Sequence, residues 1–357
     1  MMFAQVHCPD VLTPGELDTY LGNGWFRMGQ SIFTTNFLNF RNNFYSAIWL
    51  RIDLLKFSSD STQKKLSKKN SRFRSVIRAA FLNEEKESLY TKYKKNITFE
   101  TSASLRHLLF GKSNRSIFNT YEVCIYDESR LIAVGFFDLG ADSAAGITCF
   151  YDPDYKKFSL GKYLIYLKVE YCKQSGLQHF YPGYFVPGYS FFDYKLTIGH
   201  ANLEFLQLRT EQWISIEKFT PDNIPYHIMK DSLLQLGRML TERGFRSNLL
   251  KYEFFDANLV PELMGAELFD YPLVLFLGES YNDVPDHLVV YDVCDETFRL
   301  LKCRVVWKTN SSLPLSDTYS SQVLKVESEI FSSPVPMEIY NRLSSEQKYQ
   351  SFRTGTF

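Results

Sequence analysis

Hydrophobic and polar positions alternate along this chain with both helical and strand-like periods. Thr13-Pro14-Gly15-Glu16 is typical of a helix start, because Thr13 can cap, Pro14 suits the first helical turn and Glu16 can reach back to the cap. We expect this helix to end near Gly22 or Gly24. Residues 31–57 are rich in aromatic and β-branched side chains, which favours strands, and residues 46–54 are the best strand candidate there.

The middle of the chain carries the most regular pattern. Tyr121–Asp127 and Arg130–Leu139 predict a hairpin, and Ala145–Tyr151 predicts a third strand. Ser159 is expected to open an amphipathic helix that closes at Gly176, and Leu177–Tyr184 is expected to form the next strand. Three strands, a helix and a strand follow one another in the same order in the central part of N-acetyltransferase-like (GNAT) acyltransferase folds.

The remaining segments complete the expected organisation. Asp231–Arg243 predicts a further helix, and the segment that ends the chain is expected to be either a strand-rich appendage or a loosely held tail. The fold class we predict is therefore α+β, with a GNAT-like mixed sheet covered by helices on both faces, a smaller N-terminal α/β domain and a C-terminal extension. The predicted domains are an N-terminal transferase domain with a basic helical segment (residues 1–110), a GNAT-like acyl-transfer domain (residues 111–275) and a C-terminal extension of unknown role (residues 276–357).

Composition narrows the class of protein. The chain has 357 residues, of which 45% are hydrophobic and 22% charged, as in globular proteins. Its six cysteines are far apart and form no C-x-x-C pair, so a zinc knuckle, a redox dithiol or a disulfide scaffold is not expected. The sequence starts without a basic and then apolar leader, and it contains no apolar run of the ~20 residues that cross a bilayer. We therefore expect a soluble cytoplasmic protein without membrane partners.

Charge is unevenly distributed although the formal net charge is zero. Between Lys64 and Lys95 there are eleven Lys or Arg residues and three acids, on what the pattern suggests are consecutive helices. Such a run is often only a solvated helix surface. A concentration of this size also fits contact with a nucleic-acid backbone, and both interpretations stay open at this point.

Several kinds of chemistry are not supported by the motifs. There is no H-E-x-x-H zinc helix, no G-x-S-x-G nucleophile elbow and no G-x-G-x-x-G dinucleotide loop after a strand. Gly111-Lys112-Ser113 resembles the end of a P-loop, but Arg106 stands where that loop needs its first glycine. The six histidines are scattered singly, as surface or core residues are.

The start of the helix expected after Ser159 is the most informative local feature. The first N–H groups of a helix are unpaired and bind anions, and Ser159-Leu160-Gly161-Lys162 adds a small residue and a cation there. The loop that binds acetyl-CoA in acetyltransferases has the pattern R/Q-x-x-G-x-G/A, of which only Gly161 is present. An ordinary capped helix is the alternative.

A resemblance to a known family covers the same region. Phe150–Asp154, Phe158–Gly161, Tyr181–Gly188 and Tyr194-Lys195 resemble, in order and spacing, the C-terminal domain of aminoacyl-tRNA–protein transferases. The family pattern runs F-[YF]-D-P, S-L-G and then Y-L-G-Y-[WY]-I-x-G-C-x-K-M-x-Y-K. These enzymes are the arginyl and leucyl transferases of N-degron pathways, and arginylation of proteins is one of their reactions.

Upstream segments extend the resemblance over roughly residues 5–200. Gly24–Gly29 resembles G-[WF]-R-R-S-G, and Arg51-Ile52-Asp53, Phe57 and Gln63-Lys64-Lys65 resemble R-I-x-V…F-x-P-S-[RK]-S-Q-[RK]-[RK]. Two departures stand out. The family's C-x-x-C-x-x-C is replaced by Arg41, Phe44 and Ala47, and its C-x-K-M by the residues 189–192. We therefore expect no metal or cluster and an altered substrate pocket.

The resemblance implies a transfer of an amino acid, with Arg as the first candidate and Leu as the second, from aminoacyl-tRNA to the α-amine of a protein with an acidic N-terminal residue. The ester of the aminoacyl-tRNA is already activated, so positioning and stabilisation of the oxyanion can suffice. The attacking amine has an unperturbed pKa of about 7.7–8.0 and needs only modest help from a base. No cofactor beyond the aminoacyl-tRNA co-substrate is expected, and no DNA partner.

The same resemblance implies site residues. Those expected to be catalytic are Tyr151, Asp152, Tyr181 and Tyr184. Those expected to bind the tRNA or the donor are Ser159, Leu160, Gly161, Gln63, Lys64, Lys65, Lys68 and Lys69. Those expected to bind the acceptor are Arg27, Arg51, Tyr194 and Lys195.

Each of these assignments has a structural alternative. Arg27 and Arg51 can instead form salt bridges, and Asp152, the nearest acid for an arginyl donor, can instead cap the turn at Pro153. Tyr184 and Tyr194 can simply pack in the core. Two functional alternatives also remain: an acyl-CoA-dependent N-acyltransferase of the same fold, and a non-catalytic tRNA- or peptide-binding descendant.

Overall fold

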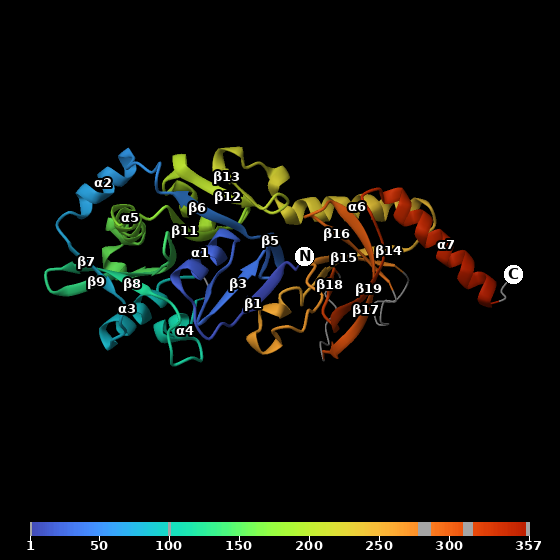
Figure 1. Cartoon of the computed structure of the whole chain (residues 1–357), viewed down its shortest axis with the longest axis horizontal. Coiled ribbons are helices and arrows are strands. Elements are labelled where there is room, and N and C mark those ends of the chain that lie inside the picture. Colours follow the sequence, from blue (N-terminus) through green and yellow to red (C-terminus); the bar gives the residue numbers. More distant parts are fainter. Residues whose placement is uncertain (1, 99–100, 278–286, 310–316, 355–357) are drawn as a thin grey trace.

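An elongated arrangement of two sheets forms the molecule in the computed structural model, which describes residues 2–98, 101–277, 287–309 and 317–354 (Figure 1). An eight-stranded sheet lies at one end and a six-stranded sheet at the other. In spatial order the larger sheet consists of β13 (Gln212–Ser215), β12 (Leu203–Gln207), β6 (Ile48–Asp53), β11 (His179–Phe185), β10 (Ser143–Tyr151), β9 (Arg130–Leu139), β8 (Thr120–Asp127) and β7 (Arg74–Ala79).

The other described strands form the second large sheet and two small ones. The six-stranded sheet consists of β18 (Thr318–Tyr319), β14 (Ser247–Tyr252), β15 (Leu273–Leu277), β16 (Leu288–Asp292), β17 (Thr297–Lys308) and β19 (Gln322–Ser333). The small sheets, which lie between the two large ones, consist of β1 (Ala4–His7), β3 (Ser31–Thr35) and β2 (Phe26–Met28), and of β4 (Phe37–Phe40) and β5 (Asn43–Ser46).

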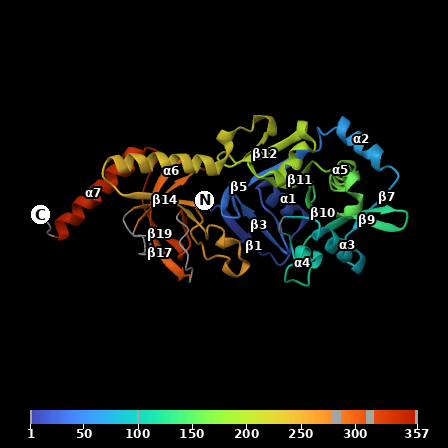
Figure 2. The same cartoon turned by 180° about the vertical axis from the view of Figure 1, so that it is seen from behind.

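Helices cover both sheets. They are α1 (Pro14–Gly22), α2 (Ser61–Asn70), α3 (Glu84–Lys94), α4 (Leu105–Phe110), α5 (Leu160–Gln174), α6 (Pro225–Glu242) and α7 (Pro336–Thr354). In Figure 2, which shows the molecule from behind, α6 runs from the larger sheet toward the six-stranded one. Among the described residues, no helix combines the length and the apolar character that a membrane-spanning segment requires.

The larger sheet has a hydrophobic core on each face. Val123 and Ile125 of β8 pack with α5 on one face, while Cys124 between them packs with α3 and α4 on the other. This alternation follows from the two-residue period of a strand. The prediction of a mixed α+β sheet with helices on both faces is confirmed.

Local signals near the chain start and in the middle are confirmed in detail. Thr13 and Glu16 form a capping box at α1, in which the Glu16 carboxylate accepts from the Thr13 amide at 2.7 Å. The predicted hairpin is β8 and β9, and the predicted helix is α5. The backbone of Ser159, however, is in the left-handed conformation with φ at 53°, and its side chain makes no cap hydrogen bond. Helix α5 therefore begins with a turn of the backbone and without a side-chain cap.

Two predictions from the pattern need correction. The basic segment is not a run of helices, because β7 lies between α2 and α3. Its six residues Arg-Ser-Val-Ile-Arg-Ala alternate too weakly for the strand period to stand out from the charges. Helix α6 also begins at Pro225, six positions before the predicted start at Asp231.

Strand pairing crosses the expected domain boundaries. β6 and β7, from the range 1–110, are strands of the larger sheet, whereas β14 and β15, from the range 111–275 and its edge, belong to the six-stranded sheet. Phe3, near the chain start, is buried in the core of the six-stranded sheet. Of the expected extension 276–357, residues 278–286, 310–316 and 355–357 lie outside the described residues.

Candidate active site

Strands β10 and β11 lie side by side for three residues only and then separate. They pair in parallel at Ser143–Ala145 and His179–Tyr181, after which β10 stays with β9 and β11 with β6. Pro182, which has no backbone N–H, and Gly183, at φ 86°, lie where the β11 register shifts. The space between the diverging strands is a cavity of about 710 Å³, which we call the inner cavity.

The lining of the inner cavity is aromatic and cationic. Its aromatic members include Phe26, Trp49, Tyr93, Tyr151, Tyr184, Phe191, Phe192 and Tyr194. Its basic members are Arg27, Lys156, Lys162, Lys168 and Lys195, and no Asp or Glu of the described residues contributes to it. Because opposite charges attract and like charges repel, the cavity suits apolar or anionic groups better than cationic ones.

Lys195 is a buried amine in the wall of the inner cavity. Its side chain is among the buried polar ones, and its Nζ donates to the Tyr184 carbonyl oxygen at 2.7 Å. The rings of Tyr184 and Phe192 lie 5.3 Å and 5.1 Å from Nζ. Burial lowers the pKa of Lys195 to about 7, because the charged form loses its hydration. A large fraction of this amine is therefore unprotonated at neutral pH.

Three tyrosines expected in the site do line the inner cavity: Tyr151, Tyr184 and Tyr194. Tyr184 packs edge-on against Trp49, with ring centroids 5.1 Å apart, and burial raises its pKa to about 12. Its hydroxyl thus keeps its proton and can donate a hydrogen bond at neutral pH. The Tyr151 ring lies 5.5 Å from that of Tyr93.

Asp152 and Tyr181 do not reach the inner cavity. Asp152 is buried, accepts from Lys92 at 2.6 Å and pairs with Arg130. Burial alone would raise the pKa of Asp152. The hydrogen bonds from Lys92 and from the Asp154 amide outweigh this effect, so the net shift of the pKa is downward. Asp152 also accepts from the Asp154 amide at 3.1 Å, so the alternative of a turn cap beside Pro153 describes its contacts.

The two arginines expected to bind the acceptor already have carboxylate partners. Arg27 pairs with Asp138 at 2.8 Å, and both side chains are fully buried. Arg51 pairs with Glu204 at 2.7 Å, and its guanidinium lies 4.7 Å from the Trp213 ring, which also packs against Tyr181. Arg27 lines the inner cavity, but Arg51 and Tyr181 do not.

The turn into α5 forms one rim of the inner cavity. Ser159 and Gly161 line it, whereas Leu160 is fully buried in the core beneath. A Cβ atom on Gly161 would lie 3.4 Å from the Tyr151 ring, so the glycine leaves the rim open beside that tyrosine. The structure thus brings Ser159 and Gly161, but not Leu160, to the cavity.

Helix α2 lies directly beside this rim. Lys69 donates to the Lys157 carbonyl oxygen, and the Asn70 side chain donates to the Phe158 carbonyl oxygen at 3.1 Å. Lys64, Lys65, Lys68 and Lys69 are exposed, and so are Lys156 and Lys157 of the turn before α5. Gln63 is buried and faces inward instead. The basic helix therefore extends a cationic surface to the mouth of the inner cavity.

Sequence reasoning missed several residues of the lining. Lys168 is buried and donates to the Phe136 and Thr148 carbonyl oxygens at 2.7 Å and 3.0 Å, which joins β9 and β10 beneath the cavity. Its position, four residues after the buried Leu164, was a usable signal. Within the described ranges, no three His, Cys, Asp or Glu side chains gather as a metal site, and the expected absence of a cofactor stays a prediction.

Comparison with known proteins shows which family these residues resemble. Residues 85–204 match the family model described as arginine-tRNA-protein transferase, C terminus. An aspartate/glutamate leucyltransferase of Leptospira interrogans is 28% identical over 217 residues, which cover 59% of this chain and 82% of the relative. An aspartate/glutamate leucyltransferase of Campylobacter jejuni is 30% identical over 152 residues, which cover 41% of this chain and 63% of the relative.

A solved structure shows a weaker likeness. The ribosomal-protein-S18-alanine N-acetyltransferase of Escherichia coli is 16% identical and covers 29% of this chain and 63% of its own, with a TM-score of 0.23. The likeness to the transferases rests instead on the sequence match, which includes the strands and the turn that form the inner cavity. On these grounds the chain is similar to the aminoacyl-tRNA–protein transferase family over the residues that form the inner cavity.

Proposed function

We propose that this protein transfers leucine from its tRNA to the N-terminal α-amine of proteins that begin with an acidic residue. The names of the relatives support both the donor and the acceptor. The single observation that carries the choice of leucine is the lining of the inner cavity, which is aromatic and cationic and has no carboxylate among the described residues. An arginyl donor would place its guanidinium there beside five basic side chains and without an acidic partner.

The donor would enter from the side of α2. Exposed lysines of α2 and of the turn before α5 would contact phosphates of the acceptor stem, as expected of recognition through the RNA backbone. The terminal adenosine would then lie at Ser159 and Gly161, and the aminoacyl ester would extend between β10 and β11.

The reaction would proceed by direct attack. The acceptor amine nitrogen forms a bond to the ester carbonyl carbon, the carbon–oxygen bond to the ribose breaks, and the ribose hydroxyl leaves with a proton. The proton lost by the amine would pass to Lys195, whose lowered pKa of about 7 makes the neutral amine available as a base, and Lys195 would then give this proton to the departing ribose oxygen. The Tyr184 hydroxyl, still protonated, would donate to the carbonyl oxygen as negative charge develops on it. Tyr151 and Tyr194 would hold the two substrates in position.

The test is a comparison of donors with the full-length protein. Leucyl-tRNA, arginyl-tRNA and acetyl-CoA are each incubated with one peptide that begins with Asp and one that begins with Ala, and the products are identified by mass. We expect a mass gain of one leucine on the Asp peptide only. Gain of arginine would refute the proposed donor, and gain of acetyl would favour the acyltransferase alternative. Binding of leucyl-tRNA without any product would favour the non-catalytic alternative.

A further inference from the structure

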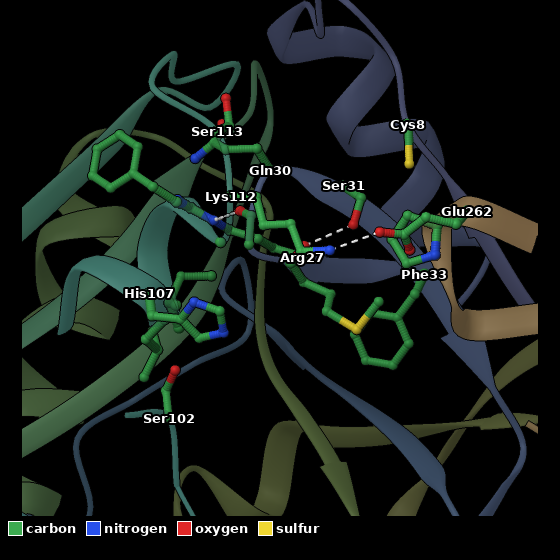
Figure 3. A pocket seen from close by; sticks show the side chains of 17 residues that line it. Cys8, Arg27, Gln30, Ser31, Phe33, Ser102, His107, Lys112, Ser113 and Glu262 are labelled. Atoms are coloured by element: carbon green, nitrogen blue, oxygen red, sulfur yellow. Dashed lines mark hydrogen bonds and ion pairs between the residues drawn. The ribbon is translucent and has the colours of Figure 1, made fainter. Parts of the chain in front are cut away.

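A second cavity, of about 690 Å³, lies next to the inner one, and we call it the outer cavity (Figure 3). Its lining comes from the β2–β3 turn, from α4 and the loop that follows, and from the segment Pro261-Glu262. In Figure 3, Cys8 and Glu262 border one side of it, and His107 and Ser102 border another.

The two cavities adjoin each other. Arg27, Phe33 and Ile147 line both of them. Ile147 is the bulged residue of β10, where the register shifts between Gly146 and Thr148. The outer cavity therefore begins next to the point where β10 and β11 separate.

The floor of the outer cavity is firmly held. The Leu109 carbonyl oxygen accepts from the Arg27 guanidinium and, at 2.7 Å, from the Gln30 side chain. Gln30 also accepts from the Ile117 amide at 2.7 Å. Gly29 and Gly111 approach so closely that a Cβ on Gly29 would lie 3.4 Å from the Gly111 backbone. The cavity is thus a preformed surface and needs little ordering when a ligand binds.

The rim of the outer cavity carries charges of both signs. Lys112 and Glu262 form an ion pair at 2.7 Å, and both side chains are largely exposed. The rim of the inner cavity is different, because exposed lysines of α2 and of the turn at Lys156-Lys157 gather there. A polyanion is therefore attracted to the α2 end, and an uncharged or mixed-charge chain fits the outer cavity better.

We propose that the outer cavity binds the acceptor polypeptide beyond its N-terminal residue, and that the Lys112–Glu262 pair selects among acceptors by the charge of those following residues. This inference rests on the proposed function, which places the acceptor amine in the inner cavity. With the tRNA at the α2 end, the outer cavity is the neighbouring space that shares Arg27, Phe33 and Ile147 with the inner cavity. Glu262 lies outside the matched residues 85–204, so this selection would be a property that the C-terminal part of the chain adds.

The experiment compares acceptors of two lengths with the full chain and leucyl-tRNA. The short acceptor is the dipeptide Asp-Ala amide, and the long ones are fluorescent decapeptides that begin with Asp and carry either Glu or Lys at positions two to four. The variants are H107W, which fills the outer cavity from α4, and K112A and E262A, which break the rim pair. The matched control is R209A, which breaks the exposed Arg209–Glu296 pair, 2.6 Å long, outside both cavities.

We expect kcat/KM for the dipeptide to stay within twofold of wild type in every variant. H107W should lower kcat/KM for both decapeptides at least tenfold. E262A should shift the preference twofold to fivefold toward the Glu decapeptide, and K112A should shift it by a similar factor toward the Lys decapeptide, as the loss of one exposed charge allows. R209A should change none of these values.

Two results would overturn the inference: variants that alter dipeptide and decapeptide alike, and variants that alter neither. Fluorescence anisotropy measures binding of the decapeptides without tRNA. It distinguishes failure of the proposed role of the outer cavity from failure of the proposed function. If wild type binds a decapeptide and H107W binds it at least tenfold more weakly, the peptide site stands even without leucine transfer. If transfer occurs but H107W binds and reacts like wild type, only the proposed role of the outer cavity fails.

Discussion

The Lys195 amine donates a hydrogen bond to the Tyr184 carbonyl oxygen at 2.7 Å inside a cavity that has cations and no carboxylate among the described residues. The same tyrosine presents its ring to that amine. A buried lysine without an acidic neighbour favours its neutral form, because burial penalises the charge and nothing offsets the penalty. The first two predictions follow from this arrangement.

Replacing Lys195 by Met should lower kcat for leucine transfer by about two orders of magnitude, the usual effect of losing a general base. In wild type, kcat should fall as the pH drops through about 7, because Lys195 then becomes protonated. The variant should lack this acidic limb. Lys173→Met is the control, since Lys173 lies on α5 outside the cavity and donates to the Phe57 carbonyl oxygen. An unchanged pH profile in Lys195→Met would contradict the proposed role.

The same substitution should change how stability depends on pH. Between pH 10.5 and about 7 the unfolded chain binds a proton at Lys195 that the folded protein does not bind, so wild-type stability rises with pH across this window. Lys195→Met removes this dependence. Relative to wild type it should gain stability as the pH falls through the window, by at most about 5 kcal/mol at pH 7 and below. Urea unfolding at pH 6, 8 and 10 measures the effect, and equal pH slopes for the two proteins would refute it.

Arg27 should prove essential for folding and not for acceptor specificity. Its guanidinium pairs with Asp138 where both side chains are buried, and it also donates to Thr120 and to the Gly29 carbonyl oxygen at 2.9 Å and 2.8 Å. Arg27→Met leaves the Asp138 charge buried and unpaired, which typically costs about 3–5 kcal/mol. Thermal and urea unfolding measure the loss.

The pair Arg51–Glu204, in which each side chain is 20% exposed, provides the comparison for this test. Arg51→Met should cost about 1 kcal/mol or less, because water already screens that pair. If Arg27→Met instead keeps wild-type stability and raises only the KM for peptides that begin with Asp, then Arg27 binds the acceptor as the family resemblance implies.

The exposed lysines of α2 should contribute to tRNA affinity through phosphates. Changing Lys64, Lys65, Lys68 and Lys69 to Gln should weaken tRNA binding and reduce the slope of log Kd against log salt by roughly one for each phosphate that a lysine no longer neutralises. A triple substitution on β17 of Lys302, Arg304 and Lys308 to Gln is the control, because these exposed side chains lie on the six-stranded sheet at the other end of the molecule (Figure 1). A salt slope that stays at the wild-type value in the α2 variant would remove the role.

Sequence patterns predicted the parts of this fold whose signals are local. The capping box at Thr13 and the hairpin of β8 and β9 depend on residues that are neighbours in the chain. β7 was missed because its arginines concealed a short strand that forms only by pairing with β8. The position of β6 between β11 and β12 depends on contacts more than a hundred residues apart, which no local pattern encodes.

The family pattern indicated part of the lining of the inner cavity, but it did not indicate the electrostatics of that lining. The family pattern located Ser159, Gly161, Tyr184 and Lys195, which the structure brings to one cavity. It could not show that Arg27 and Asp152 are occupied by charged partners, because Asp138 and Lys92 are remote in sequence. The family pattern also could not show that Lys195 is buried, because lysines are normally exposed and keep their charged end in water.

The interleaved order of the larger sheet limits how this protein can be dissected. A fragment that starts at residue 85, where the matched region begins, would lose β6 and β7. The strands β8, β11 and β12 would then each have an unpaired edge. Unpaired edges of this kind recruit strands from other molecules. Expression of such a piece should yield aggregates, and a working minimal version must retain the beginning of the polypeptide together with everything through β13. Transplanting the catalytic centre into another scaffold would face the same obstacle.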